Sequence, residues 1–137
     1  MGSIELDRQS YRYLLDLVYV GNWILNSTRG NDRIEEYDRV ESLIYSLCEK
    51  FGLSELAEDV AGEIVPSERY AMGGIHEAIC DYEDSVFYDI LAQELARRDL
   101  AGLDVDGIDS AVLELKVAQY MEEFAGHGLD NISVRGF

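Results

Sequence analysis

The chain has 137 residues, of which 47% are hydrophobic and 28% are charged, and its formal net charge is −17. A chain of this length suits one domain, which normally buries roughly two-thirds of the surface that its unfolded form exposes. The negative charge argues against direct binding to nucleic acid or to an anionic membrane, because both need a basic surface.

The cysteines and the apolar stretches bear on the compartment. Cys48 and Cys80 lack the spacing of a metal or redox motif, and the N-terminus lacks the pattern of a secretory signal, so we expect a cytoplasmic protein. The most apolar stretch, residues 13–25, is too short to span a bilayer. Residues 1–30 hold three acids and three bases, so the whole acidic excess belongs to residues 31–137.

The first predicted element is a helix over residues 7–28. Its apolar residues recur at helical spacing but spread around most of the circumference, which is typical of a helix that others surround. Arg12 and Asp16 stand four residues apart and can form an ion pair on one face. We expect this helix to lie at the centre of a bundle.

A second helix is expected after the turn-forming residues 27–32. Asn31 or Asp32 can cap its N-terminus with a side-chain oxygen. Its apolar stripe continues as far as Phe51, and Gly52 should end it because glycine readily adopts the left-handed conformation that terminates helices.

A third helix is predicted from Ser54 until Pro66 stops it. The apolar residues between these positions recur at spacings of three and four, which indicate a helix, and proline lacks the N–H that would continue it. No segment of the chain shows enough alternation of apolar and polar residues to build a strand. We therefore expect no significant sheet.

The second half of the chain predicts further helices. Ser67 can cap a new start, but the glycines 73–74 should interrupt it. A helical pattern then resumes at Ile75 and ends near Arg97 and Arg98, whose charges suit the carbonyl end of a helix.

A last helix is expected from about Ile108 to Ala125, with Asp106 or Asp109 as its cap. The preceding sequence DVDGID, residues 104–109, has the composition of a calcium loop, but its glycine and final ligand fall in the wrong register. A capping loop is the better interpretation.

These elements predict an all-α fold. We expect a compact, single-domain bundle of five or six helices over residues 1–137, with residues 1–6 and 129–137 at its periphery.

Acidic side chains concentrate in residues 76–89, HEAICDYEDSVFYD. On a helical wheel Glu77, Asp81 and Asp84 project opposite the apolar residues, and Tyr88 falls on the same acidic side. Tyrosine suits protein interfaces because its ring is apolar and its hydroxyl is polar. We therefore predict a binding face formed by these four side chains. The histidines and cysteines of the chain match no compact zinc spacing.

Two acid motifs permit an enzymatic alternative. Glu55-Leu-Ala-Glu58 is followed by Asp81-Tyr-Glu-Asp84, and this pattern resembles the Glu-x-x-Glu and Glu-x-x-Asp motifs of the MazG-like, all-α nucleoside triphosphate pyrophosphohydrolases. The resemblance implies an oligomeric enzyme in which the four carboxylates hold Mg²⁺, which neutralises phosphate charge and orients the attacking water. The chain departs from the pattern at Asp81, where the family has glutamate. On the wheel both pairs also project away from their apolar stripes.

The leading functional prediction follows from the charge. We expect a small, non-enzymatic accessory or protein-interaction module that uses its acidic surface to bind another protein, a basic one, and needs no cofactor. The same charge can also serve solubility alone. A third alternative is a homo-oligomer assembled through the first helix or through the tail from Leu129.

Overall fold

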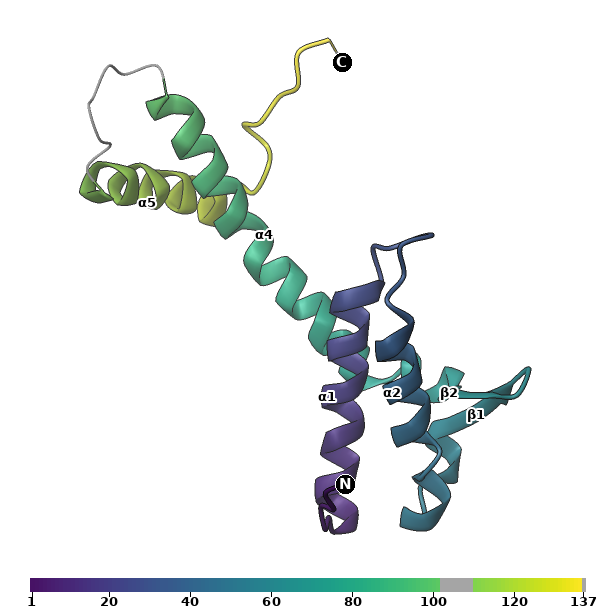
Figure 1. The fold of residues 1–137 in the computed structure, drawn as a ribbon. Helices are drawn as coiled ribbons and strands as arrows, with labels where there is room; N and C mark the ends of the chain where they lie inside the picture. The colour runs from purple at the N-terminus through teal and green to yellow at the C-terminus, as the bar shows by residue number, and fades with distance from the viewer. Residues whose placement is uncertain (102–109, 137) are drawn as a thin grey trace. The chain divides into compact units, whose positions relative to one another are not determined.

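The computed structural model describes residues 1–101 and 110–136. Its contacts divide the chain into two compact units, Met1–Cys80 and Asp81–Phe137. In the described residues no helix is long and apolar enough to cross a membrane. The elements, in chain order, are α1 (Arg8–Asn26), α2 (Glu35–Tyr45), the 3-10 helices η1 (Cys48–Phe51) and η2 (Ser54–Leu56), the strands β1 (Ala57–Val60) and β2 (Glu63–Pro66), and the helices α3 (Glu68–Ala71), α4 (Gly74–Leu100) and α5 (Ser110–His127) (Figure 1).

The prediction of a mainly helical chain is confirmed, and two details of it are wrong. A small two-stranded sheet is present, and the set of helices is not the expected one, because most of the predicted third helix forms a hairpin. Within the first unit, helix α1 is not surrounded by other helices: it buries Tyr11 and Leu15 on one face and exposes Leu17 on another.

In the first unit, α1 and α2 lie side by side and run in opposite directions (Figure 1). The Asp7 side chain caps α1 by accepting a hydrogen bond of 2.7 Å from the Ser10 N–H. The predicted pair of Arg12 with Asp16 is present as an ion pair. Helix α1 therefore forms as its sequence predicts.

Buried tyrosines hold the core of this unit together. The hydroxyl of Tyr11 donates to the Ile44 carbonyl at 2.6 Å, and its ring stacks on Phe51 with centroids 3.9 Å apart. Tyr45 donates to the Leu15 carbonyl at 3.2 Å, and Tyr70 donates to the Asp16 carboxylate at 2.6 Å. Each ring fills core volume while its hydroxyl is satisfied by a group of another element.

The predicted caps of the second helix are wrong. Ile34 occupies the N-cap position, and no side chain of the cap residue bonds to the helix. Asp32 instead accepts a hydrogen bond from the Gly30 N–H at 3.2 Å, within the preceding turn. The expected end is close to the observed one, because η1 follows α2 and Gly52 terminates it with φ of +66°.

The predicted third helix is wrong: its residues form η2 and an antiparallel hairpin. Val60 pairs with Glu63, so Ala61 and Gly62 make a two-residue turn with φ of +57° and +93°. Positive φ at both positions is the signature of a type I′ turn, whose twist matches the flanking strands. The Asp59 carboxylate accepts from the Gly62 N–H at 2.7 Å and supports the turn.

Ser67 caps a helix, and the chain leaves the helical conformation near Gly73 and Gly74, as predicted. The Ser67 hydroxyl accepts from the Tyr70 N–H at 3.2 Å and caps the short α3, and the helix is interrupted before α4 begins at Gly74. Helix α4 then continues without a break to Leu100.

In the second unit, the core comprises Ala92, Ala96 and Leu100 of α4 and Phe124 of α5. Helix α5 agrees with the predicted last helix. The predicted caps Asp106 and Asp109, and the sequence DVDGID, lie outside the described residues. Residues 1–6 and the described part of 129–137 belong to no helix or strand.

The hairpin turn provides a test of the fold. Ala61 adopts a left-handed conformation that costs an L-residue with a Cβ roughly 1 kcal/mol, whereas asparagine tolerates it. We expect Ala61→Asn to stabilise the protein by roughly 0.5 to 1 kcal/mol and Ala61→Val to destabilise it. Urea unfolding measures both. An Ala61→Asn protein no more stable than the wild type would contradict the turn.

Candidate functional site

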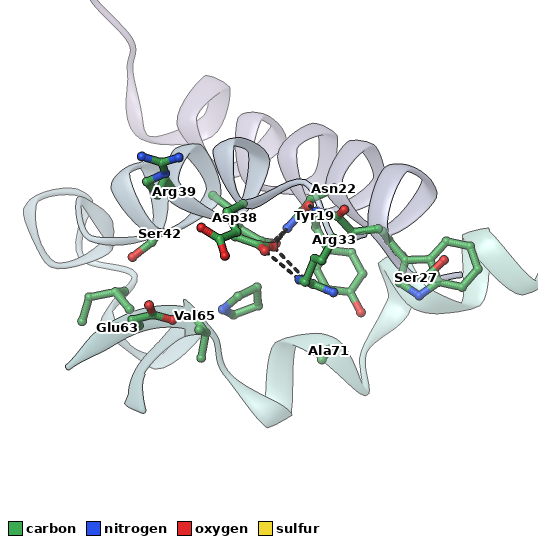
Figure 2. Close-up of a pocket in the computed structure, with 16 residues that line it drawn as sticks. Tyr19, Asn22, Ser27, Arg33, Asp38, Arg39, Ser42, Glu63, Val65 and Ala71 are labelled. Atoms are coloured by element: carbon green, nitrogen blue, oxygen red, sulfur yellow. Dashed lines mark hydrogen bonds and ion pairs between the residues drawn. The ribbon is translucent and has the colours of Figure 1, made fainter. Parts of the chain in front are cut away.

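A pocket of about 1020 Å³ opens in the first unit among α1, α2 and β2. Tyr19, Asn22 and Trp23 line it from α1, Asp38 and Glu41 from α2, and residues 64–66 from β2. Figure 2 shows Asn22 and Arg33 both directed toward Asp38. Arg33 of the segment before α2 and Ala71 of α3 also line it, so the pocket combines aromatic, charged and apolar side chains.

Asn26 sets the turn that leads from α1 to α2. This side chain is only 1% exposed. Its amide N–H donates to the Ile34 carbonyl at 3.1 Å, and its carbonyl oxygen accepts from the Ile34 N–H at 2.9 Å. A buried side chain therefore replaces the cap that Asn31 or Asp32 was expected to supply, and it fixes where α2 begins.

Asn22, one helical turn earlier, joins α1 to the acidic side chains of α2. Its amide N–H group donates to Asp38 at 3.0 Å and to Glu41 at 2.6 Å, and its carbonyl oxygen accepts from Asn26 at 2.8 Å. Because both protons of the amide are used, Asn22 orients the two carboxylates that line the pocket.

Asp38 and Glu41 differ in their electrostatic surroundings. Arg33 forms a bidentate ion pair with Asp38, with distances of 2.6 and 2.7 Å, and these hydrogen bonds lower the pKa of the Asp38 carboxyl. Glu41 has no ion pair among the described residues. Burial raises the pKa of Glu41, and the neighbouring charge of Asp38 adds to the rise, against a lowering by the hydrogen bond from Asn22.

The aromatic residues that line the pocket pack against His76 of α4. The His76 ring packs edge-on against both Tyr19 and Trp23, with centroids 6.3 and 6.0 Å away. The Tyr19 hydroxyl oxygen lies 3.2 Å from His76 Nδ1. Burial raises the pKa of the Tyr19 phenol, and the charge of Glu41 contributes to that rise, so the two groups are electrostatically coupled.

The predicted acidic face lies on α4. Glu77, Asp81 and Asp84 are exposed, and none of them has an ion pair in the part of the chain that the structure describes. Tyr88 is half-buried, because its ring packs against Phe124 with centroids 5.4 Å apart. The acids are therefore open to solvent, while much of the tyrosine belongs to the core of the second unit.

The acid motifs of the enzymatic alternative are not on paired helices. Glu55 lies in η2 and Glu58 on β1, so the helical placement assumed for the first motif is wrong. Both side chains are exposed, as are Asp81 and Asp84 on α4. Among residues 1–101 and 110–136, no three histidine, cysteine, aspartate or glutamate side chains are arranged to hold a metal ion.

The residues that build the pocket were missed by the sequence analysis. Their signal was available: Asn22 and Asn26 stand four apart, and both lie on the same face of α1 as the buried Tyr11 and Leu15. A polar side chain in such a position needs a partner, and the acidic start of α2 is the nearest sequence that supplies one.

The two hydrogen bonds between the Asn26 side chain and the Ile34 backbone form a clamp, which can be tested with a nearly isosteric change at Asn26. Asn26→Asp keeps the acceptor for the Ile34 N–H but loses the donor to its carbonyl and adds a charge near Asp38. We expect a loss of roughly 2 kcal/mol of unfolding free energy, measured by urea unfolding. Asn31→Asp, which makes the same change at an exposed turn position, is the control and should be close to neutral. Equal stabilities of the two variants would rule out the clamp.

The raised pKa of Glu41 predicts a pH dependence. Because the folded protein holds this proton more tightly than the unfolded chain, Glu41 lowers stability as pH rises from about 4 through its folded pKa. We expect the stability of Glu41→Gln, relative to wild type, to increase across this window. Asp38 has the opposite slope and is present in both proteins, so the difference between them reports the loss of Glu41 together with its interaction with Asp38. Parallel stability curves for the two proteins would contradict the prediction.

Comparison with models of protein families, with curated proteins and with solved structures found no match. The chain's own surfaces therefore have to indicate its function. Of these, the pocket beside Glu41 offers the most specific combination of chemical groups.

Proposed function

We propose that the chain is a non-enzymatic interaction module that binds a basic segment of another protein, with the pocket of the first unit receiving a lysine or arginine side chain. The observation that carries the proposal is the state of Glu41. Its carboxylate is partly desolvated in the pocket and is bound by the neutral Asn22, while the hydrogen bonds of Arg33 go to Asp38. The charge of Arg33 acts on Glu41 without a direct ion pair, and a cationic side chain in the pocket would supply that pair.

The aromatic residues of the pocket suit the same ligand. Tyr19 and Trp23 line it beside Glu41, and the faces of such rings attract ammonium and guanidinium groups. The apolar stems of lysine and arginine could pack against residues 64–66 of β2 while their charged ends reach the carboxylate. One pocket thereby offers both parts of a basic side chain a matching surface.

The overall charge favours encounter with a basic partner. The formal charge of −17, together with the unpaired acids on α4, creates a negative field that attracts such a protein over a distance. This attraction raises the association rate and falls with added salt. The acidic face predicted from the sequence then contributes to steering, and the pocket contributes to recognition.

The single tryptophan of the chain makes the binding step measurable. Trp23 lines the pocket, so its fluorescence should change when short synthetic peptides rich in lysine or arginine bind there. We expect saturable changes that weaken at high salt, and no change with the corresponding glutamate peptides. An unaffected fluorescence, with binding absent by calorimetry as well, would contradict the proposal.

A matched pair of variants separates recognition from general attraction. Glu41→Gln and Glu77→Gln each remove one negative charge, but only Glu41 lies in the pocket. We expect Glu41→Gln to weaken peptide binding by roughly tenfold or more and Glu77→Gln by about twofold at most. Equal losses would mean that net charge alone attracts the peptides and that the pocket is not the site.

A further inference from the structure

Helix α1 carries a second apolar stripe in addition to the face that packs in the core. Tyr13, Leu17, Val20 and Ile24 follow one another at spacings of four, three and four residues. At 100° per residue they lie roughly opposite the buried Tyr11 and Leu15. This spacing is that of the seam of a two-stranded coiled coil.

The stripe is open to solvent over most of its length. Tyr13 is 59%, Leu17 72% and Ile24 58% exposed, and Val20 is half-buried. Exposed apolar residues that stand singly need no explanation, but four in register along one helix form a continuous surface. Packing against the core already stabilises α1 as a helix. Binding of a partner helix therefore does not include the free-energy cost of forming α1.

The charge distribution indicates which partner fits. Residues 1–30 are neutral overall, and the two charged side chains of α1 that lie closest to the stripe around the helix, Arg12 and Asp16, form an ion pair with each other. The excess of −17 lies entirely in residues 31–137. Two copies of the chain therefore repel each other when their acidic surfaces approach. The stripe is a face on which two copies can meet without bringing like charges together.

We propose that the stripe is a homodimer interface on which α1 of a second copy packs across a two-fold axis. Such an axis brings the same apolar surface from both copies together. The four side chains per copy make a small interface, so we expect a weak dimer with a dissociation constant on the order of micromolar. This proposal does not depend on the peptide-binding function of the pocket.

The dimer has a distinctive response to salt. Added salt screens the repulsion between two negative copies, so the dimer should tighten when ionic strength rises from about 0.05 to 0.5 M. Binding of a basic peptide weakens under the same change. Sedimentation equilibrium of the full chain across a range of concentrations measures the first effect. A monomer at all concentrations and both salt levels would overturn the proposal.

Two variants locate the interface. Leu17→Glu places a charge in the middle of the stripe, and Leu43→Glu places the same charge on α2, where Leu43 is 63% exposed. Both positions face solvent, so circular dichroism should report an unchanged fold. We expect Leu17→Glu to weaken dimerisation at least tenfold and Leu43→Glu to leave it within about twofold of wild type. The reverse order, or equal weakening by both variants, would also overturn the proposal.

Discussion

The fold of the first unit depends on the hydrogen bonds by which the Asn26 side chain holds the backbone of Ile34. This contact joins the end of α1 to the start of α2 and fixes the position from which α2 runs back along α1. Asn22 then orients Asp38 and Glu41, because the same helical face places it one turn away. The contact between Asn26 and Ile34 therefore replaces a helix cap, and it also positions the residues that line the pocket.

The tyrosine core and the pocket use polar groups in different ways. In the core, each buried hydroxyl of Tyr11, Tyr45 and Tyr70 is matched by an acceptor, so the polar atoms stabilise the packing. In the pocket, Glu41 is held by Asn22 and has no ion pair among the described residues, while the charge of Arg33 acts on it only from a greater distance. Its raised pKa means that the folded state is less stable with this carboxylate ionised. Glu41 therefore lowers the stability of the folded state when it is ionised, whereas the buried tyrosine hydroxyls raise that stability. Such a side chain is typical of a binding site rather than of a contact that stabilises the fold.

Local signals predicted much of the fold. Ser67 caps α3 as predicted because its hydroxyl oxygen accepts from the N–H three residues later, an interaction that sequence alone indicates. The hairpin was missed because its apolar residues happen to recur at helical spacing and its strands contain residues, such as Glu58 and Asp59, that are uncommon in sheets. The turn at Ala61 also lacks the usual Asn-Gly signature. The candidate site was missed because it depends on contacts between α1 and α2 that no single segment encodes.

The unequal distribution of charge reconciles the two proposed interactions. A chain with a charge of −17 spread evenly would repel its own copies on every face. Here residues 1–30, which are neutral overall, include the apolar stripe of α1, while the acidic excess lies on later elements and around the pocket. Self-association would then leave the acidic surface available, and pairing two copies would double the negative field that a basic partner meets. The pocket residues Tyr19 and Asn22 lie on a different side of α1 from Leu17, so occupancy of one surface does not require the other to be vacant.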